Sequence, residues 1–185
     1  MIEFPKNACE VVNHLTRDHL TLIRVADIDC SQAQFDRIIS ICNESVVFSS
    51  LFSEMFPEGR YPESAAQEFV RWSKEGWEKG THFVFATVDS DGLVVSTSDI
   101  KSNQRDDAEI GYLCSAAHSG VMTNSVSAML NLAVEAGFRS FIAHVRAHNV
   151  ASQRVLKRVG FRRVGESPPG SKRLRYRLEN GSTLR

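Results

Sequence analysis

The stretch that decides the fold runs from Asn149 to Phe161 and reads NVASQRVLKRVGF. Asn149 is a helix-capping residue, and the apolar positions that follow fall on one side of a helical repeat. Gly160 stands where glycine commonly ends a helix, and Phe161 begins the next apolar segment. The pattern predicts a helix over residues 150–159 that returns the chain to a sheet.

A second decisive stretch lies one strand and one helix earlier. Residues 109–114 alternate as a strand, a turn of small residues ends at Gly120, and a helical pattern covers residues 122–136. The first turn of a helix exposes unpaired N–H groups, and a glycine there lets a phosphate approach the backbone. A single glycine before a helix is also common in ordinary turns, so both interpretations stay open.

The remaining pattern predicts a mixed α/β order without internal repeats or linkers. Strands are expected at residues 20–25, 82–88, 93–98, 108–113, 141–145, 161–164 and 174–178. Helices are expected after the capping residues 27–31 and from Pro62 to Gly80. Asp91-Gly92 marks a hairpin turn, and residues 168–170 mark the connection between the last two strands.

Two aromatic groups are expected to pack. Residues 48–61 suit a loop or short turns packed by Phe52, Met55 and Phe56. Phe69, Trp72 and Trp77 form a stripe on the second helix and are expected to belong to the core.

The length of 185 residues fits one domain spanning residues 1–185. Apolar residues make up 42% and charged residues 24%, which gives no support to a disordered, collagen-like or disulfide-framework class. No apolar run approaches the roughly 18 residues of a membrane span, and the first residues lack a signal-peptide layout. The four cysteines and six histidines show no metal-ligand spacing. We expect a cytoplasmic protein with reduced thiols, no membrane segment and no metal.

Charge is distributed unevenly although the formal net charge is zero. Residues 1–138 contain 10 Lys or Arg against 20 Asp or Glu, whereas residues 139–185 contain 12 against 2. Either both parts are solvated faces of one domain, or the basic part receives an anion and the acidic part a cation. Arg173, Arg175 and Arg177 could contact nucleic acid, but they alternate with apolar residues as in a half-buried strand. That alternation argues against a nucleic-acid partner.

The two decisive stretches together resemble the GNAT superfamily of acyl-CoA-dependent N-acetyltransferases. The resemblance rests on Asn149-x-x-Ser152, then seven residues and Gly160-Phe161, with the glycine turn one helix and one strand earlier. EIGY at 109–112 and GVMTNS at 120–125 are most similar to its ribosomal-protein N-terminal acetyltransferase group. The similarity covers about residues 20–161. It implies an α/β (α+β) fold with a mixed, mostly antiparallel central sheet of about seven strands, helices on both faces and a splayed cofactor cleft.

The resemblance also implies a site for acetyl-CoA (coenzyme A). The strand at 110–114 would splay from the strand at 141–145, and the cofactor would lie in the opening. Its pantetheine arm would pair with backbone groups of Leu113, Cys114 and Ser115. Its pyrophosphate would rest on the N–H groups of His118, Ser119, Gly120, Val121, Met122 and Thr123. Asn149 would approach the pantetheine, and Ser152 would face the thioester.

The expected reaction is direct attack of a neutral amine on the acetyl thioester, with a backbone N–H of residues 113–115 steadying the oxyanion. Ser152 is the candidate acid, directly or through water, and Glu109 is the candidate base, through water. Glu109 could equally be a solvated carboxylate at a strand edge. The histidines at 118, 144 and 148 are further proton acceptors with structural alternatives. Cys114 is assigned a packing role.

Two departures from the superfamily pattern bear on function. The loop usually reads Arg/Gln-x-x-Gly-x-Gly/Ala, and alignment on Gly120 places Ala117 first and Met122 last. Leu156 stands where many members carry the tyrosine that protonates the thiolate. These departures motivate a second hypothesis, a non-catalytic acyl-CoA sensor or a degenerate GNAT-fold scaffold.

The expected acceptor is a primary amine on a peptide, a protein or a small molecule. An α-amine is neutral at pH 7 far more often than a lysine amine, so it asks least of these candidate bases. The acidic excess before residue 138 suits any cationic acceptor. A homodimer would be consistent with the family.

Overall fold

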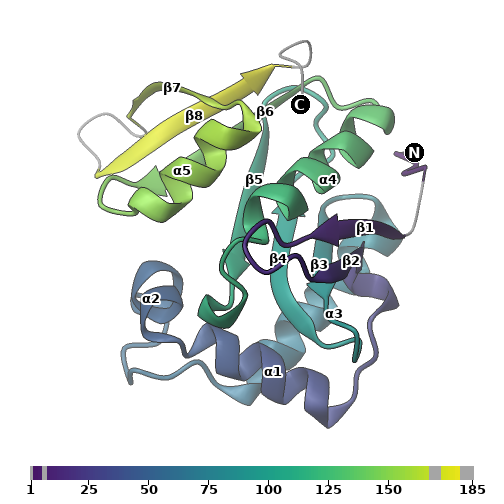
Figure 1. Cartoon of the computed structure of the whole chain (residues 1–185), viewed down its shortest axis with the longest axis vertical. Coiled ribbons are helices and arrows are strands. Elements are labelled where there is room, and N and C mark those ends of the chain that lie inside the picture. The colour runs from purple at the N-terminus through teal and green to yellow at the C-terminus, as the bar shows by residue number, and fades with distance from the viewer. Residues whose placement is uncertain (1, 6–7, 167–171, 180–185) are drawn as a thin grey trace.

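The computed structural model describes residues 2–5, 8–166 and 172–179. Its centre is one eight-stranded sheet in the order β1-β2-β3-β4-β5-β6-β8-β7 (Figure 1). The strands are β1 (Ala8–Val12), β2 (His19–Arg24), β3 (Phe83–Val88), β4 (Val94–Ile100), β5 (Ala108–Cys114), β6 (Ser140–Arg146), β7 (Arg162–Glu166) and β8 (Arg173–Glu179). Neighbouring strands run antiparallel except β5 and β6, which are parallel. The sequence-based expectation of a mixed, mostly antiparallel sheet is confirmed.

Helices cover both faces of this sheet (Figure 1). They are α1 (Gln32–Cys42), α2 (Ser45–Val47), α3 (Glu63–Lys79), α4 (Met122–Glu135) and α5 (Val150–Val159). Short 3-10 turns span Val25–Asp27 and Ala116–His118, and a π-helical turn spans Phe48–Phe52. Strand alternation divides the core: Phe83 and Phe85 of β3 pack with α4 and α5, whereas Val84 and Ala86 pack with α1 and α3.

Local signals account for the helix ends. The hydroxyl of Ser31 accepts a hydrogen bond from Gln34 N–H at the start of α1. The side chain of Asn149 accepts from Ser152 N–H at 3.0 Å at the start of α5. Gly80 and Gly160 end α3 and α5 with φ of 63° and 105°, a region that glycine enters without strain.

The described residues form one more strand than the seven expected. β1 reads ACEVV and buries Val11 alone, so it lacks the alternation that would have predicted it. Pairing with β2 over five residues, from Ala8 opposite Ile23 to Val12 opposite His19, makes it an edge strand. The expected connection at residues 168–170 lies outside the described residues.

Two predicted packing roles were wrong. Phe52 and Phe56 do pack on Tyr61, with ring centroids 4.7 and 5.4 Å away, but Met55 is 61% exposed. Trp72 is 39% exposed and stacks on His82 at 3.9 Å, because the His82 ring occupies the space that Gly76 leaves open on α3.

No helix in the described part of the chain is both long and apolar enough to span a membrane.

Candidate active site

The two parallel strands at the centre of the sheet pair over a short distance and then diverge. Ala108, Glu109 and Ile110 of β5 lie opposite Phe141, Ile142 and Ala143 of β6. Beyond these three pairs, β5 continues against β4 as far as Cys114, and β6 continues against β8 as far as Arg146. Within the described residues, the strand ends are therefore splayed, as the resemblance implied.

The hydrogen-bond direction decides which backbone groups line this opening. Ser115 N–H donates to Val95 O at 3.0 Å, and Glu109 O accepts from Lys101 N–H at 2.8 Å, so odd-numbered residues of β5 bond to β4. Alternation in an antiparallel pair turns the N–H and C=O of Tyr112 and Cys114 to the other side. Of residues 113–115, Cys114 is thus the one whose backbone groups face the opening.

The turn after β5 leaves part of a helix N-terminus unoccupied. His118, Ser119 and Val121 donate their N–H groups to carbonyls inside the turn at 3.1 to 3.3 Å. The N–H groups of Gly120, Thr123 and Asn124 have no acceptor among the described residues. The predicted anion site therefore narrows to Gly120 and the first turn of α4, where free N–H groups and the helix dipole favour negative charge.

The turn between β1 and β2 supports Gly120 from the other side. Asn13 is buried and donates from Nδ2 to Ser119 O at 3.2 Å, and Nδ1 of His14 lies 2.5 Å from Gly120 O. Gly120 has φ of +103°, and a Cβ there would overlap Asn13 Oδ1 and lie 2.8 Å from Leu15 Cγ. Glycine is therefore required at 120 by both conformation and space.

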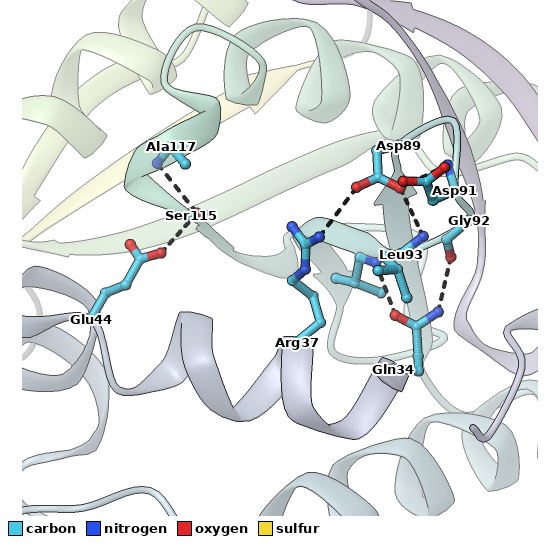
Figure 2. Close-up of polar contacts among 10 residues, drawn as sticks. Gln34, Arg37, Glu44, Asp89, Asp91, Gly92, Leu93, Ser115 and Ala117 are labelled. Carbon is cyan, nitrogen blue, oxygen red and sulfur yellow. Dashed lines mark hydrogen bonds and ion pairs between the residues drawn. The ribbon is translucent and has the colours of Figure 1, made fainter. Parts of the chain in front are cut away.

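Glu44, at the start of α2, holds the beginning of the same turn (Figure 2). Its Oε1 accepts from the Ser115 hydroxyl at 2.7 Å. Its Oε2 accepts from Ala116 N–H at 2.6 Å. The Ser115 hydroxyl in turn accepts from Ala117 N–H at 3.3 Å. The segment between α1 and α3 is thereby fixed to the end of β5.

Ser152, in the first turn of α5, is joined to β5 through a tyrosine. The hydroxyl of Tyr112 donates to Ser152 O at 3.0 Å and lies 2.7 Å from Ser152 Oγ. A phenol has one proton, so with that proton on the carbonyl, the Ser152 hydroxyl is the donor in the shorter contact. Burial raises the pKa of Tyr112, which keeps its hydroxyl protonated.

The opposite face of the sheet carries charged groups beside the opening. Oε1 of Glu109 accepts from Lys101 Nζ at 2.6 Å, and Oε2 lies 3.8 Å from His144 Nδ1. Asp99 lies across from Gly111, where a Cβ would overlap its carboxylate, and burial raises the pKa of Asp99. Glu109 and His144 therefore come together, whereas Glu109 and Ser152 lie on different faces of the sheet.

The comparisons with known proteins agree with this geometry. The family model described as "Acetyltransferase (GNAT) domain" matches residues 22–162. The chain belongs to the GNAT acetyltransferase family. It is an acetyltransferase that uses acetyl-CoA as its acetyl donor. No curated protein matches it.

Solved structures share the GNAT fold at low sequence identity. Mycobacterium smegmatis RimJ in complex with CoA-disulfide has a TM-score of 0.78 and 18% identity, over 98% of this chain and 90% of that one. The ribosomal alpha-N-protein acetyltransferase RimL has a TM-score of 0.71 and 15% identity, over 94% and 95%. The microcin self-immunity acetyltransferase MccE, solved with acetyl-CoA and AMP, has a TM-score of 0.69 and 16% identity, over 87% and 92%. At these identities the likeness concerns the fold.

The residues at the opening fit the chemistry of coenzyme A. The outward backbone groups of Tyr112 and Cys114 can pair with the amides of an extended pantetheine arm, as a sheet edge pairs with a peptide. The free N–H groups of Gly120 and Thr123 suit a diphosphate. Glu44 already occupies the N–H of Ala116, so the anion site begins after that residue.

The two departures from the GNAT pattern have structural explanations. Met122 is 7% exposed and Leu156 is 1% exposed, and both belong to the core beneath α4 and α5. Ala117 is exposed in the short turn before α4. Leu156 thus contributes packing, and a hydroxyl near the opening comes instead from Tyr112 and Ser152.

Burial also affects the protonation of the Cys114 thiol. It raises the pKa of this thiol to about 12, with a smaller contribution from the Glu44 carboxylate. The thiol stays protonated near neutral pH, which agrees with the packing role predicted for it.

Sequence reasoning missed the supporting contacts of Tyr112, Glu44, Lys101 and Asn13. Tyr112 had a detectable signal, since a tyrosine between apolar strand residues must find a partner for its hydroxyl. Glu44 and Asn13 had no such signal, because their partners lie 71 and 106 positions away along the chain.

Two arginines of the basic C-terminal strand β8 lie against acidic groups. Arg177 pairs with Asp107 at 2.7 Å and with Glu179 at 2.8 Å, and Arg175 lies 4.0 Å from Asp107. These contacts agree with the prediction that the alternating arginines belong to a half-buried strand.

Proposed function

We propose that this GNAT chain, acting as a single domain, transfers the acetyl group of acetyl-CoA to a primary amine by direct attack on the thioester. One observation carries the proposal: β5 and β6 part after three pairs, directly below a helix N-terminus with free amides. Acetyl-CoA supplies the activated acetyl group. The protein's own residues hold acetyl-CoA, orient the reactants and transfer protons.

Cofactor binding is assigned to the opening and the turn above it. Cys114, with Leu113 and Ser115 beside it, receives the pantetheine arm, and the Cys114 N–H is oriented to stabilise an oxyanion. The diphosphate takes Gly120 and the start of α4 at Met122 and Thr123. The N–H groups of His118, Ser119 and Val121 are already donated to carbonyls inside the turn. Asn149 holds the first turn of α5 against the arm.

Ser152 is the proposed acid for the departing thiolate. Its hydroxyl lies 2.7 Å from the Tyr112 hydroxyl, which orients it and can share its proton. A positioned acid contributes ~10²–10⁴-fold, whereas holding two reactants in attack geometry can supply ~7–11 kcal/mol. The core position of Leu156 is therefore compatible with activity.

Glu109 is the proposed carboxylate for proton removal, acting through an intermediary. Its Oε1 is engaged by Lys101 at 2.6 Å, which limits direct contact with an acceptor. The pair lies on the face opposite α4 and α5, so an acceptor would enter from the side of α1 and α3.

The acceptor class that best suits this site is an α-amine of a peptide or protein, with a small-molecule amine as the alternative. With reference pKa values of ~7.8 and ~10.4, an α-amine is neutral about 340 times as often as a lysine amine at pH 7. The structural neighbour RimL, an alpha-N-protein acetyltransferase, supports the same class by fold likeness.

Two assays test this function. Isothermal titration with acetyl-CoA should give saturable heat, and mass spectrometry of peptides with free α-amines should show one added acetyl group per chain. Binding without transfer to any peptide or small amine would favour the non-catalytic sensor. Absence of heat at millimolar cofactor would defeat both functions.

A further inference from the structure

His144 has an unexplained nitrogen at the level where the strands part. It follows Ala143, the last residue of β6 paired with β5. Its Nδ1 faces Glu109, and its Nε2 is buried without a hydrogen-bond partner among the described residues. An unpaired buried polar atom costs about 1–3 kcal/mol, and in a native protein such an atom calls for an explanation.

The Glu109 carboxylate lies beside one edge of the imidazole. Lys101 holds one carboxylate oxygen at 2.6 Å, and the other lies 3.8 Å from His144 Nδ1. A carboxylate beside one ring nitrogen favours the tautomer with its proton on that nitrogen. The lone pair is then left on Nε2, on the opposite edge of the ring.

Two arginines lie near His144, and one of them, Arg175, also has a buried Nε without a hydrogen-bond partner among the described residues. Arg175 is the neighbour of His144 on β8 and lies 4.0 Å from Asp107. Arg146, two residues along β6, pairs with Glu54 at 2.9 Å. Within the described ranges, Glu109 is the acidic group within ion-pair distance of the imidazole.

We propose that Nε2 of His144 takes the proton of the acceptor amine and that Glu109 acts through it as a positioning residue. This inference rests on the proposed acetyl transfer to an amine. It assigns the acceptor side of the site to His144, Glu109 and Lys101. The acid, Ser152, lies on the other face of the sheet.

The proton and bond changes balance. An ammonium acceptor gives one proton to Nε2, and the imidazolium that forms is stabilised by the Glu109 carboxylate. The freed nitrogen lone pair forms the C–N bond at the thioester carbonyl as the C–S bond breaks. The second proton of the attacking nitrogen replaces the one that Ser152 supplies to the thiolate. The imidazolium returns its proton to solvent.

Proton removal asks least of the proposed base when the acceptor is a weakly basic amine. The pKa of a lysine ammonium is about 2.6 units higher than that of an α-ammonium. The same peptide should therefore be acetylated at its α-amine in preference to a lysine side chain.

His144→Gln is the test variant and His19→Gln is the matched control, since His19 is an exposed histidine on β2, away from the proposed site. We expect His144→Gln to lower kcat/KM for an α-amine peptide by about 100-fold or more at pH 7. The deficit should shrink toward pH 9.5, where the amine is already neutral. The control variant and the Kd for acetyl-CoA should match the wild type. If kcat/KM of His144→Gln equals that of the wild type at pH 7, or falls by the same factor at every pH, the assignment is overturned.

Chemical rescue separates proton transfer from a structural role. His144→Ala that still binds acetyl-CoA should regain activity as free imidazole is added, with saturation. Lack of any recovery would overturn the proposal. Failure of the wild type to acetylate any amine would refute the proposed function as well, whereas an active wild type matched by His144→Gln would refute this inference alone.

Discussion

Gly120→Ala should weaken both the fold and cofactor binding. The added Cβ would overlap Asn13 Oδ1 and lie 2.8 Å from Leu15 Cγ, at a backbone φ of +103°. Strain at such a φ costs about 1–3 kcal/mol. Displacing Asn13 breaks its hydrogen bonds to Leu15 N–H and Ser119 O, at about 0.5–1.5 kcal/mol each. The free energy of unfolding should fall by about 2–6 kcal/mol.

The same substitution displaces the N–H groups of Gly120 and the first turn of α4, which are proposed to bind the diphosphate. Loss of one hydrogen bond to a charged group is worth about 1.5–3 kcal/mol, so the Kd for acetyl-CoA should rise about tenfold or more.

Gly59→Ala is the matched control. Gly59 has φ of +83°, and nothing lies within 4 Å of its added Cβ. It should lose about 1–3 kcal/mol of stability and bind acetyl-CoA like the wild type. Denaturant unfolding gives the stabilities, and calorimetry gives both Kd values. Equal acetyl-CoA affinity in the two folded variants would refute the role given to Gly120.

Three further predictions concern single side chains. Tyr112→Phe removes the hydroxyl that contacts Ser152, so we expect a loss of about 1–2 kcal/mol in stability and a fall in kcat of about tenfold. The control Tyr61→Phe should lower stability alone. Equal steady-state kcat values for the two variants would contradict the proposed contribution of Tyr112 to proton transfer. Glu44→Gln replaces a carboxylate that accepts two hydrogen bonds from the turn after β5, so thermal unfolding should show a loss of about 1–3 kcal/mol, and an unchanged melting temperature would count against that contact. Burial raises the pKa of Cys114 from 9.0 to about 12, so an unfolded chain binds fewer protons above pH 9 and stability is lost as pH rises. Between pH 8 and pH 10, the wild type should lose about 1.4 kcal/mol more than Cys114→Ala in denaturant unfolding, and parallel curves would contradict this.

Sequence predicted the elements whose signals are local. The helix caps at Asn149 and Gly160 and the hairpin turn at Gly92 depend on neighbouring residues. The structure confirms both caps and the turn. β1 was missed because its pairing partner, β2, defines it, and five residues with one buried side chain carry little pattern of their own.

The site was predicted in outline from motifs, and its detail depends on tertiary contacts. The splay of β5 from β6 follows from the family resemblance and is confirmed. Which amides stay free depends on hydrogen bonds inside the turn. Val121 N–H donates to His118 O, whereas the N–H groups of Gly120 and Thr123 have no acceptor in the part of the chain that the structure describes. The Tyr112 contact with Ser152 joins residues 40 positions apart, which spacing alone does not reveal.

The central claim is that acetyl-CoA lies between β5 and β6 with its diphosphate on the first turn of α4. Hydrogen–deuterium exchange with and without acetyl-CoA tests it most directly, because free amides exchange quickly unless a ligand covers them. The account predicts slowed exchange at Cys114, Gly120, Thr123 and Asn124, with little change at β1 or β7. Saturating acetyl-CoA that leaves those four amides exchanging at their original rates would contradict it.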